Sequence, residues 1–174
     1  ARQTLVQAQR LKASVDEAQH SPCGTFSIGV LPTIAPYLIP RFYPEFSRRY
    51  PEVELHITEM KTSSIKAALI NGDIDAGILA NMEGLDDFLT QTLFYEQYFV
   101  YAAHDNPLSQ LPSVKTNDLR EVPLWLLDEG HCFRDQLMQF CQLKSGRRSQ
   151  RSYHLGSIET FMRMVENGVG VTFI

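Results

Sequence analysis

The sequence contains no long apolar run and few cysteines, and each absence excludes a class of protein. No stretch approaches the roughly 18 consecutive apolar residues that a membrane-spanning helix needs. Three cysteines in 174 residues, without an Asn-x-Ser/Thr acceptor, favour the cytoplasm over a secreted disulfide scaffold. The net charge of −4 argues against direct binding of nucleic acid or an anionic membrane by this chain.

Short motifs of known enzymes and metal sites are also missing. There is no Gly-x-Ser-x-Gly, Walker loop or His-Glu-x-x-His. Residues 63–66 match Ser-x-x-Lys without its companion motifs, so a helix start is the better interpretation. The five histidines are scattered and no Cys-x-x-Cys exists, which argues against a metal site. We therefore predict neither a metal nor a cofactor.

What the sequence does contain is an alternation of strand and helix patterns, typical of βαβ units and an α/β sheet. Thr62 or Ser63 is the predicted cap of the second helix, and Asn71-Gly72 its end. The predicted strands are 25–31, 53–57, 74–80, 92–95, 98–103, 124–127 and 169–174, and the predicted helices are 36–50, 62–70, 117–119 and 157–166, with Pro40 and Pro44 as kinks or early breaks in the first.

Residues 2–19 carry a narrow apolar stripe at helical spacing. Such a stripe suits a helix that pairs with another chain or crosses its own domain, and a frayed leader fits equally well.

The segment 128–141 is the most informative part of the chain. It begins with Asp-Glu-Gly, residues that are typical of turns, and apolar residues then recur at helical spacing. Cys132 and Cys141 are nine residues apart. In a continuous helix their Cα atoms would be roughly 13 Å apart, whereas a disulfide needs about 4.4–6.8 Å. Either these cysteines never pair, or pairing them unwinds the segment.

Cys132 falls at or just before the first turn of this helix, where free N–H groups and the helix dipole favour an anion. His131 and Arg134 add donors or positive charge, which lowers a thiol pKa, while Asp135 opposes this unless it caps the helix or pairs with Arg134. The thiolate is the form that peroxide oxidises. The alternative is that both cysteines are buried, inert small hydrophobes.

Three loops at predicted helix starts, 32–36, 61–64 and 130–132, could bind a small anionic or polar ligand if they meet in a cleft.

Two longer stretches resemble a known family. Residues 25–40, with Ile-Gly-Val-Leu-Pro-Thr-Ile-Ala-Pro-Tyr-Leu-Ile-Pro, and residues 157–174 resemble the effector-binding domain of LysR-type transcriptional regulators. The segment 129–141, including the cysteine spacing, resembles the peroxide-sensing OxyR branch of that family. The resemblance implies two Rossmann-like lobes of the type-II periplasmic-binding-protein kind. It also implies a linker-helix fragment at 1–20, lobe I at 21–96 and lobe II at 97–174, with a redox segment at 128–144.

The resemblance also implies residue roles. Cys132 would be the peroxidatic cysteine and Cys141 the resolving one. The positions that match a peroxide pocket are Thr33, Thr62, Gly130 and His131, with Arg134 and Asp135 in support. The family's winged-helix DNA-binding domain and the segment that returns to complete lobe I, with a pocket arginine, have no counterpart in this sequence.

The predicted function is therefore the regulatory domain of a hydrogen-peroxide-sensing transcription factor rather than an enzyme. Its expected partners are hydrogen peroxide, a second or further copies in a homodimer or homotetramer, promoter DNA, RNA polymerase and a thiol reductant, with no membrane. Two alternatives stay open at this point: a LysR-type domain sensing a small organic effector with inert cysteines, and a thiol peroxidase.

Overall fold

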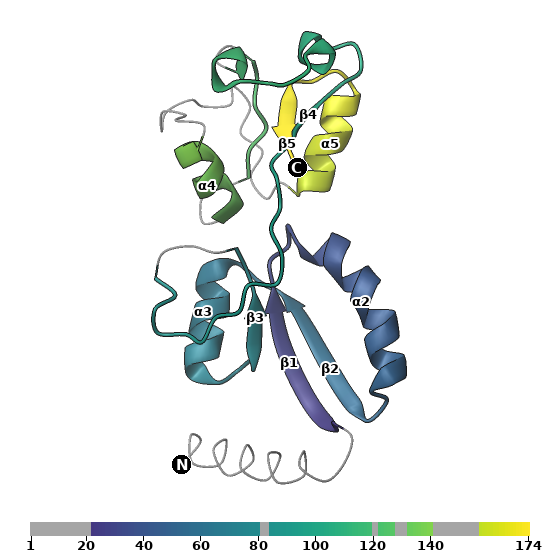
Figure 1. The fold of residues 1–174 in the computed structure, drawn as a ribbon, viewed down its shortest axis with the longest axis vertical. Helices are drawn as coiled ribbons and strands as arrows, with labels where there is room; N and C mark the ends of the chain where they lie inside the picture. Colours follow the sequence, from purple (N-terminus) through teal and green to yellow (C-terminus); the bar gives the residue numbers. More distant parts are fainter. Residues whose placement is uncertain (1–21, 81–83, 120–121, 128–131, 141–156) are drawn as a thin grey trace. The chain divides into compact units, whose positions relative to one another are not determined.

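The computed structural model describes residues 22–80, 84–119, 122–127, 132–140 and 157–174. These residues form two compact units, divided between Leu79 and Ala80 (Figure 1). The predicted lobe boundary at 96–97 concerns how the chain divides between lobes, and it stays a prediction. So does the linker helix at 1–20, which lies outside the described residues.

The described residues of the first unit form a three-stranded parallel sheet in the order β2-β1-β3, with two helices. Strand β1 is central, and its Val30 lies opposite Glu59 of β2 and Ile78 of β3. The predicted strand and helix alternation is confirmed here. The elements are β1 (Gly24–Val30), α2 (Ala35–Arg49), β2 (Val53–Glu59), α3 (Thr62–Asn71) and β3 (Ala76–Ile78).

The two helices cover opposite faces of this sheet because strand residues alternate in direction. Ile28 and Val30 of β1 are buried in a cluster that includes Ala35 and other α2 residues. Between them, Gly29 faces α3, where an added Cβ would lie 3.1 Å from Ile65. A Cβ on Gly77 would come within 2.4 Å of the same side chain. Two strand glycines therefore let α3 lie close against the sheet.

Two details of the helices differ from the prediction. Helix α2 runs unbroken with Pro40 and Pro44 inside it, so an early break at either proline is wrong. The predicted cap of α3 is also wrong: the cap residue is Lys61, which makes no side-chain cap bond, and Thr62 is the first helical residue. The end of α3 is as predicted, because Gly72 takes the left-handed conformation with φ of 73°.

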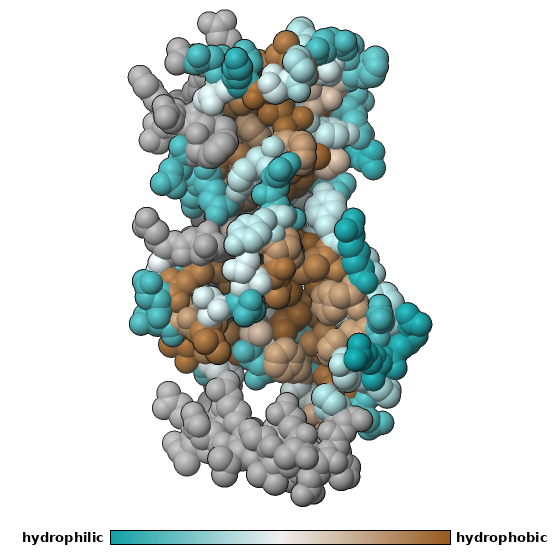
Figure 2. Space-filling view, viewed as in Figure 1, coloured by the Kyte–Doolittle hydropathy of each residue, from teal (hydrophilic) through white to brown (hydrophobic). Residues whose placement is uncertain are grey.

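Apolar side chains are also exposed on the first unit. Tyr37 and Tyr43 of α2 are 46% and 41% exposed. A shallow groove between α2 and β2 has Ala35, Ile39, Tyr43 and Ile57 in its lining. In Figure 2 apolar residues gather over this unit in the view shown.

The second unit has a two-stranded antiparallel sheet, in which Tyr101 of β4 lies opposite Thr172 of β5. The predicted strand at 124–127 is reduced to a single bridge between Leu124 and Val171. The predicted strand at 92–95 is wrong: these residues pair with no strand, and Tyr95 is 93% exposed. The elements are β4 (Val100–Ala102), the short 3-10 helices η1 (Pro107–Gln110) and η2 (Thr116–Leu119), α4 (Cys132–Phe140), α5 (Ile158–Glu166) and β5 (Val171–Phe173).

Among the described residues of the second unit, the buried apolar side chains form two clusters. The first contains Leu119 and Leu137, and the second contains Trp125 and Phe161, whose rings stack with centroids 5.8 Å apart. The indole N–H of Trp125 donates to the carbonyl of Val169 at 2.6 Å. Phe133 is half-buried and packs against both clusters. Helix α4 is thus held by contacts to both of these clusters.

Candidate functional site

The carboxyl edge of the first sheet carries two of the predicted site residues. Thr33 lies in the turn between β1 and α2, and Thr62 lies three residues beyond the end of β2. Because β1 and β2 are parallel and in register from Gly24 to Val30, both turns lie at the same edge. The amide of Met60 donates to the carbonyl of Val30 at 2.9 Å, which ties the two turns together. Ligands of open α/β sheets bind outside this edge.

Thr62 is the unusual residue of this edge. It is 6% exposed, and its hydroxyl has no hydrogen-bond partner. No other buried side-chain nitrogen or oxygen in the described parts of the chain is unpartnered. A buried hydroxyl without a partner costs about 1–3 kcal/mol, so its presence calls for a reason. Binding of a small polar ligand would supply one.

In the second unit, helix α4 begins at Cys132, as predicted from the turn residues that precede it. Arg134 is half-buried and Asp135 is exposed in the first turn. The remaining predicted residues, Gly130, His131 and Cys141, lie outside the described residues, as does the side chain of Cys132. Their convergence with Thr33 and Thr62 in one pocket stays a prediction.

Two further residues fix the position of α4. Leu137 is fully buried. The ring of Tyr98 packs edge-on against Phe133, with centroids 5.4 Å apart, and its hydroxyl donates to Gln136 Oε1 at 2.5 Å. The helical spacing of apolar residues indicated Leu137. Nothing in the local sequence indicated Tyr98, because it lies 38 residues before Gln136.

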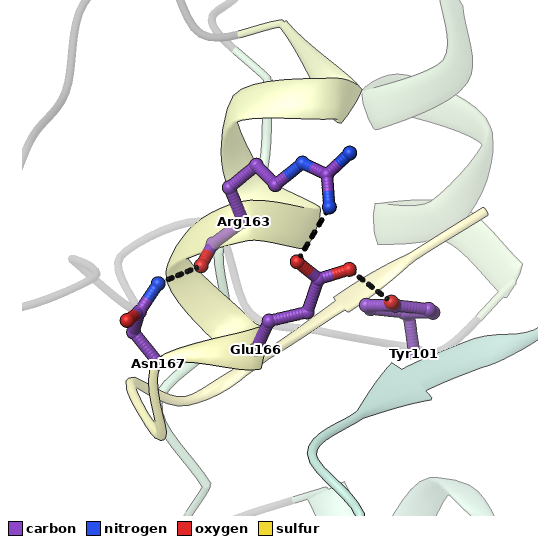
Figure 3. A network of polar contacts seen from close by, with 4 residues as sticks. All are labelled: Tyr101, Arg163, Glu166 and Asn167. Carbon is purple, nitrogen blue, oxygen red and sulfur yellow. Dashed lines mark hydrogen bonds and ion pairs between the residues drawn. The ribbon is translucent and has the colours of Figure 1, made fainter.

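A polar network joins β4 to the end of α5 (Figure 3). The carboxylate of Glu166 accepts from Tyr101 and from Arg163, each at 2.8 Å. The Arg163 guanidinium and then the Tyr101 hydroxyl hold the pKa of Glu166 below its ordinary value, and the same bond raises the pKa of Tyr101. The Asn167 side chain donates to the carbonyl of Arg163 at 2.7 Å. These contacts fasten α5 to the sheet and hold no reactive group.

The described ranges also lack two kinds of feature. No group of three or more histidine, cysteine, aspartate and glutamate side chains there could hold a metal ion. None of the helices within those ranges has the length and apolar character needed to cross a membrane.

Residues 19–174 match the LysR substrate binding domain. The chain therefore belongs to the LysR family, and the predicted α/β class with its two-lobed, type-II periplasmic-binding-protein-like architecture is confirmed. Within that family its similarity is to the OxyR branch, as predicted.

Two curated relatives illustrate the similarity. Over 174 residues the chain is 32% identical to the DNA-binding transcriptional dual regulator OxyR of Escherichia coli K12 and to the hydrogen peroxide-inducible genes activator of Pectobacterium carotovorum. Each match covers 100% of this chain and 57% of the relative, so the chain spans little more than half of these proteins. The relatives are named as regulators and gene activators, in agreement with the prediction that the chain is not an enzyme.

Solved structures give the same result. OxyR from Porphyromonas gingivalis is 44% identical with a TM-score of 0.76, over 87% of this chain and 69% of that one. A mutant of Corynebacterium glutamicum OxyR with hydrogen peroxide bound is 28% identical with a TM-score of 0.84, over 99% of this chain and 55% of that one.

Proposed function

We propose that this chain is the sensing domain of a cytoplasmic transcriptional regulator that responds to hydrogen peroxide through Cys132. The observation that carries the proposal is the position of Cys132 as the first residue of α4, in a chain that matches peroxide-inducible activators over its whole length. A cysteine at a helix start meets unpaired backbone N–H groups and the positive end of the helix dipole. Both stabilise a thiolate, and the guanidinium of Arg134 two residues later adds positive charge.

The proposed reaction has two steps. The Cys132 thiolate attacks one oxygen of hydrogen peroxide, an S–O bond forms, the O–O bond breaks, and the departing hydroxide takes a proton to become water. Sulfur loses two electrons to the peroxide and becomes a sulfenic acid. The thiol of Cys141 then attacks that sulfur, the S–S bond forms, and the S–O bond breaks with release of a second water. A thiol reductant returns both cysteines to the starting state.

The geometry of α4 connects this chemistry to a change of shape. Eight residue steps at about 1.5 Å each place the Cα atoms of Cys132 and Phe140 roughly 12 Å apart. A residue bonded to Phe140 has its Cα about 3.8 Å from it, whereas a disulfide needs Cα atoms within about 6.8 Å. The Cys132–Cys141 disulfide therefore requires α4 to unwind. A covalent bond would in this way drive one element between two states.

We further propose that Thr33, Thr62, Gly130 and His131 bind the peroxide, with Arg134 and Asp135 in support. The placement of Thr33 and Thr62 at one sheet edge and the unpartnered Thr62 hydroxyl support this assignment. No cofactor is required, because peroxide itself is the oxidant.

In the whole protein we propose that the refolded segment repacks a contact between copies in a homodimer or homotetramer. The apolar groove between α2 and β2 offers a surface for such a contact. The change would alter how a winged-helix domain engages promoter DNA and RNA polymerase.

The direct test is mass spectrometry after one equivalent of hydrogen peroxide, with alkylation under non-reducing conditions. We expect a loss of two hydrogens that maps to a Cys132–Cys141 crosslink. Three freely alkylated thiols would reject the proposal and leave sensing of a small organic effector as the function. Continued turnover of many equivalents of peroxide with a reductant would instead indicate a thiol peroxidase.

A Thr62→Val substitution tests the pocket. Valine has nearly the shape of threonine and removes a buried hydroxyl that lacks a partner, so the free energy of unfolding should stay the same or rise by up to about 1 kcal/mol. Peroxide oxidation of Cys132, followed by stopped-flow mixing, should slow by about tenfold, as expected for loss of one hydrogen bond to the bound peroxide.

The matched control is Thr172→Val. Thr172 is also buried, but its hydroxyl donates to the carbonyl of Trp125 at 2.9 Å. This substitution should lower the free energy of unfolding by about 1 kcal/mol and leave the oxidation rate unchanged. Equal oxidation rates in wild type and Thr62→Val would count against a role for Thr62 in the pocket.

A further inference from the structure

Tyr98 contacts the N-terminal half of α4 at two residues. Its hydroxyl donates to Gln136 and its ring packs on Phe133, the residue that follows Cys132. We propose that Tyr98 is a positioning residue for the redox reaction: it binds α4 only while the helix is intact, and so sets how readily Cys132 reaches Cys141. The inference rests on the proposed function and adds to it a residue that controls how fast the disulfide forms.

The two contacts can exist together only on a helix. Phe133 and Gln136 are three residues apart, and on a helix such residues are neighbours, with Cβ atoms about 5–6 Å apart. In an extended chain the same residues would be roughly 10 Å apart. Tyr98 therefore has more contacts to the helical state than to an unwound one. A group with such a difference shifts the equilibrium between the two states toward the helix.

The backbone next to Tyr98 is fixed by strand pairing. The next residue, Phe99, exchanges two backbone hydrogen bonds with Ile174, at 2.9 and 3.0 Å, which continue the ladder between β4 and β5. The aromatic side chain thus projects from the end of a sheet. Opening of the first turn of α4 would have to break both contacts to Tyr98, because Tyr98 cannot follow the helix without loss of this ladder.

Tyr98 acts locally rather than as part of the core. Its side chain is 39% exposed, whereas Leu137 of the second turn is fully buried. Loss of the Tyr98 hydroxyl should therefore change the opening of α4 far more than the stability of the unit. Tyr101 offers a comparison within the same unit. Its hydroxyl also donates to a helix side chain, at 2.8 Å, but the acceptor, Glu166, lies on α5.

The experiment compares Tyr98→Phe with Tyr101→Phe. In Tyr98→Phe we expect the backbone amides of α4 to exchange hydrogen about two- to fivefold faster, since one partly exposed hydrogen bond is lost. The step from sulfenic acid to disulfide, resolved by rapid quench and alkylation, should accelerate by a similar factor. Formation of the sulfenic acid should keep its rate, because most molecules still carry an intact helix. Tyr101→Phe should leave all three rates unchanged.

Equal α4 exchange in Tyr98→Phe and wild type would overturn the inference, and so would equal acceleration in both variants. Hydrogen exchange does not depend on the cysteines. If the wild-type protein forms no disulfide, the proposed function fails, while the amide exchange of α4 still decides whether Tyr98 holds the helix.

Discussion

A Cys132→Ser variant should form no peroxide-dependent crosslink and should give no transcriptional response to peroxide in the whole regulator. The serine hydroxyl stays protonated at neutral pH and cannot be oxidised to a sulfenic acid equivalent, so the first step of the proposed reaction is lost entirely. Oxidation is measured by the mass change after one equivalent of peroxide, and the response by a reporter under the regulator's own promoter. A preserved response would remove the model.

The control for this variant is Cys23→Ser. Cys23 is exposed and free, and lies just before β1 in the first unit. Its substitution removes a thiol of the same chain without touching α4, so the crosslink and the response should both be retained. If Cys23→Ser also abolished the response, general thiol damage would explain the oxidation better than a dedicated cysteine pair.

Leu137→Ala should have a large effect on stability and on the redox equilibrium. Leu137 is fully buried in the cluster that includes Leu119, and truncation of such a residue costs about 2–5 kcal/mol of folding free energy. In the proposed reaction the disulfide unwinds α4 and releases Leu137 from this cluster, so the truncation would destabilise only the reduced state. The oxidised state becomes relatively more stable. The reduction potential should shift by as much as roughly 40–110 mV to more negative values.

Leu119→Ala separates this effect from simple loss of stability. Leu119 is 2% exposed and packs in the same cluster, but it belongs to η2 rather than α4. Both variants should lower the denaturation midpoint, and only Leu137→Ala should move the potential measured against a glutathione buffer. An unchanged potential in Leu137→Ala would mean that α4 stays helical on oxidation.

Much of the first unit could be predicted because its signals are local. Alternating apolar residues define β1 and β2, and the Asn71-Gly72 pair ends α3 by backbone geometry alone. The cap of α3 is Lys61, one or two residues before the predicted Thr62 or Ser63. Threonine is a good cap by propensity, but here its hydroxyl is buried without a partner.

The two errors in the predicted strands of the second unit have a common cause. A segment forms a strand only where a neighbouring strand is available to pair with it. Residues 92–95 have the pattern of a strand, yet no neighbouring strand pairs with them, and residues 124–127 form only one bridge. For the site, the turn-forming residues Asp-Glu-Gly before the helix correctly predicted that Cys132 lies at a helix start. Tyr98 could not be found in this way, since its partners are 35 and 38 residues away and no spacing rule connects them.

Phe133 packs against both apolar clusters of the second unit, and it follows Cys132 directly. A helix that unwinds from its first turn would draw this ring out of both clusters together. A half-unwound state would lose packing in each cluster without yet gaining the disulfide, and would therefore be scarcely populated. The consequence is an all-or-none response: each molecule would be either fully on or fully off, and graded signals would arise only from the proportion of molecules in each state.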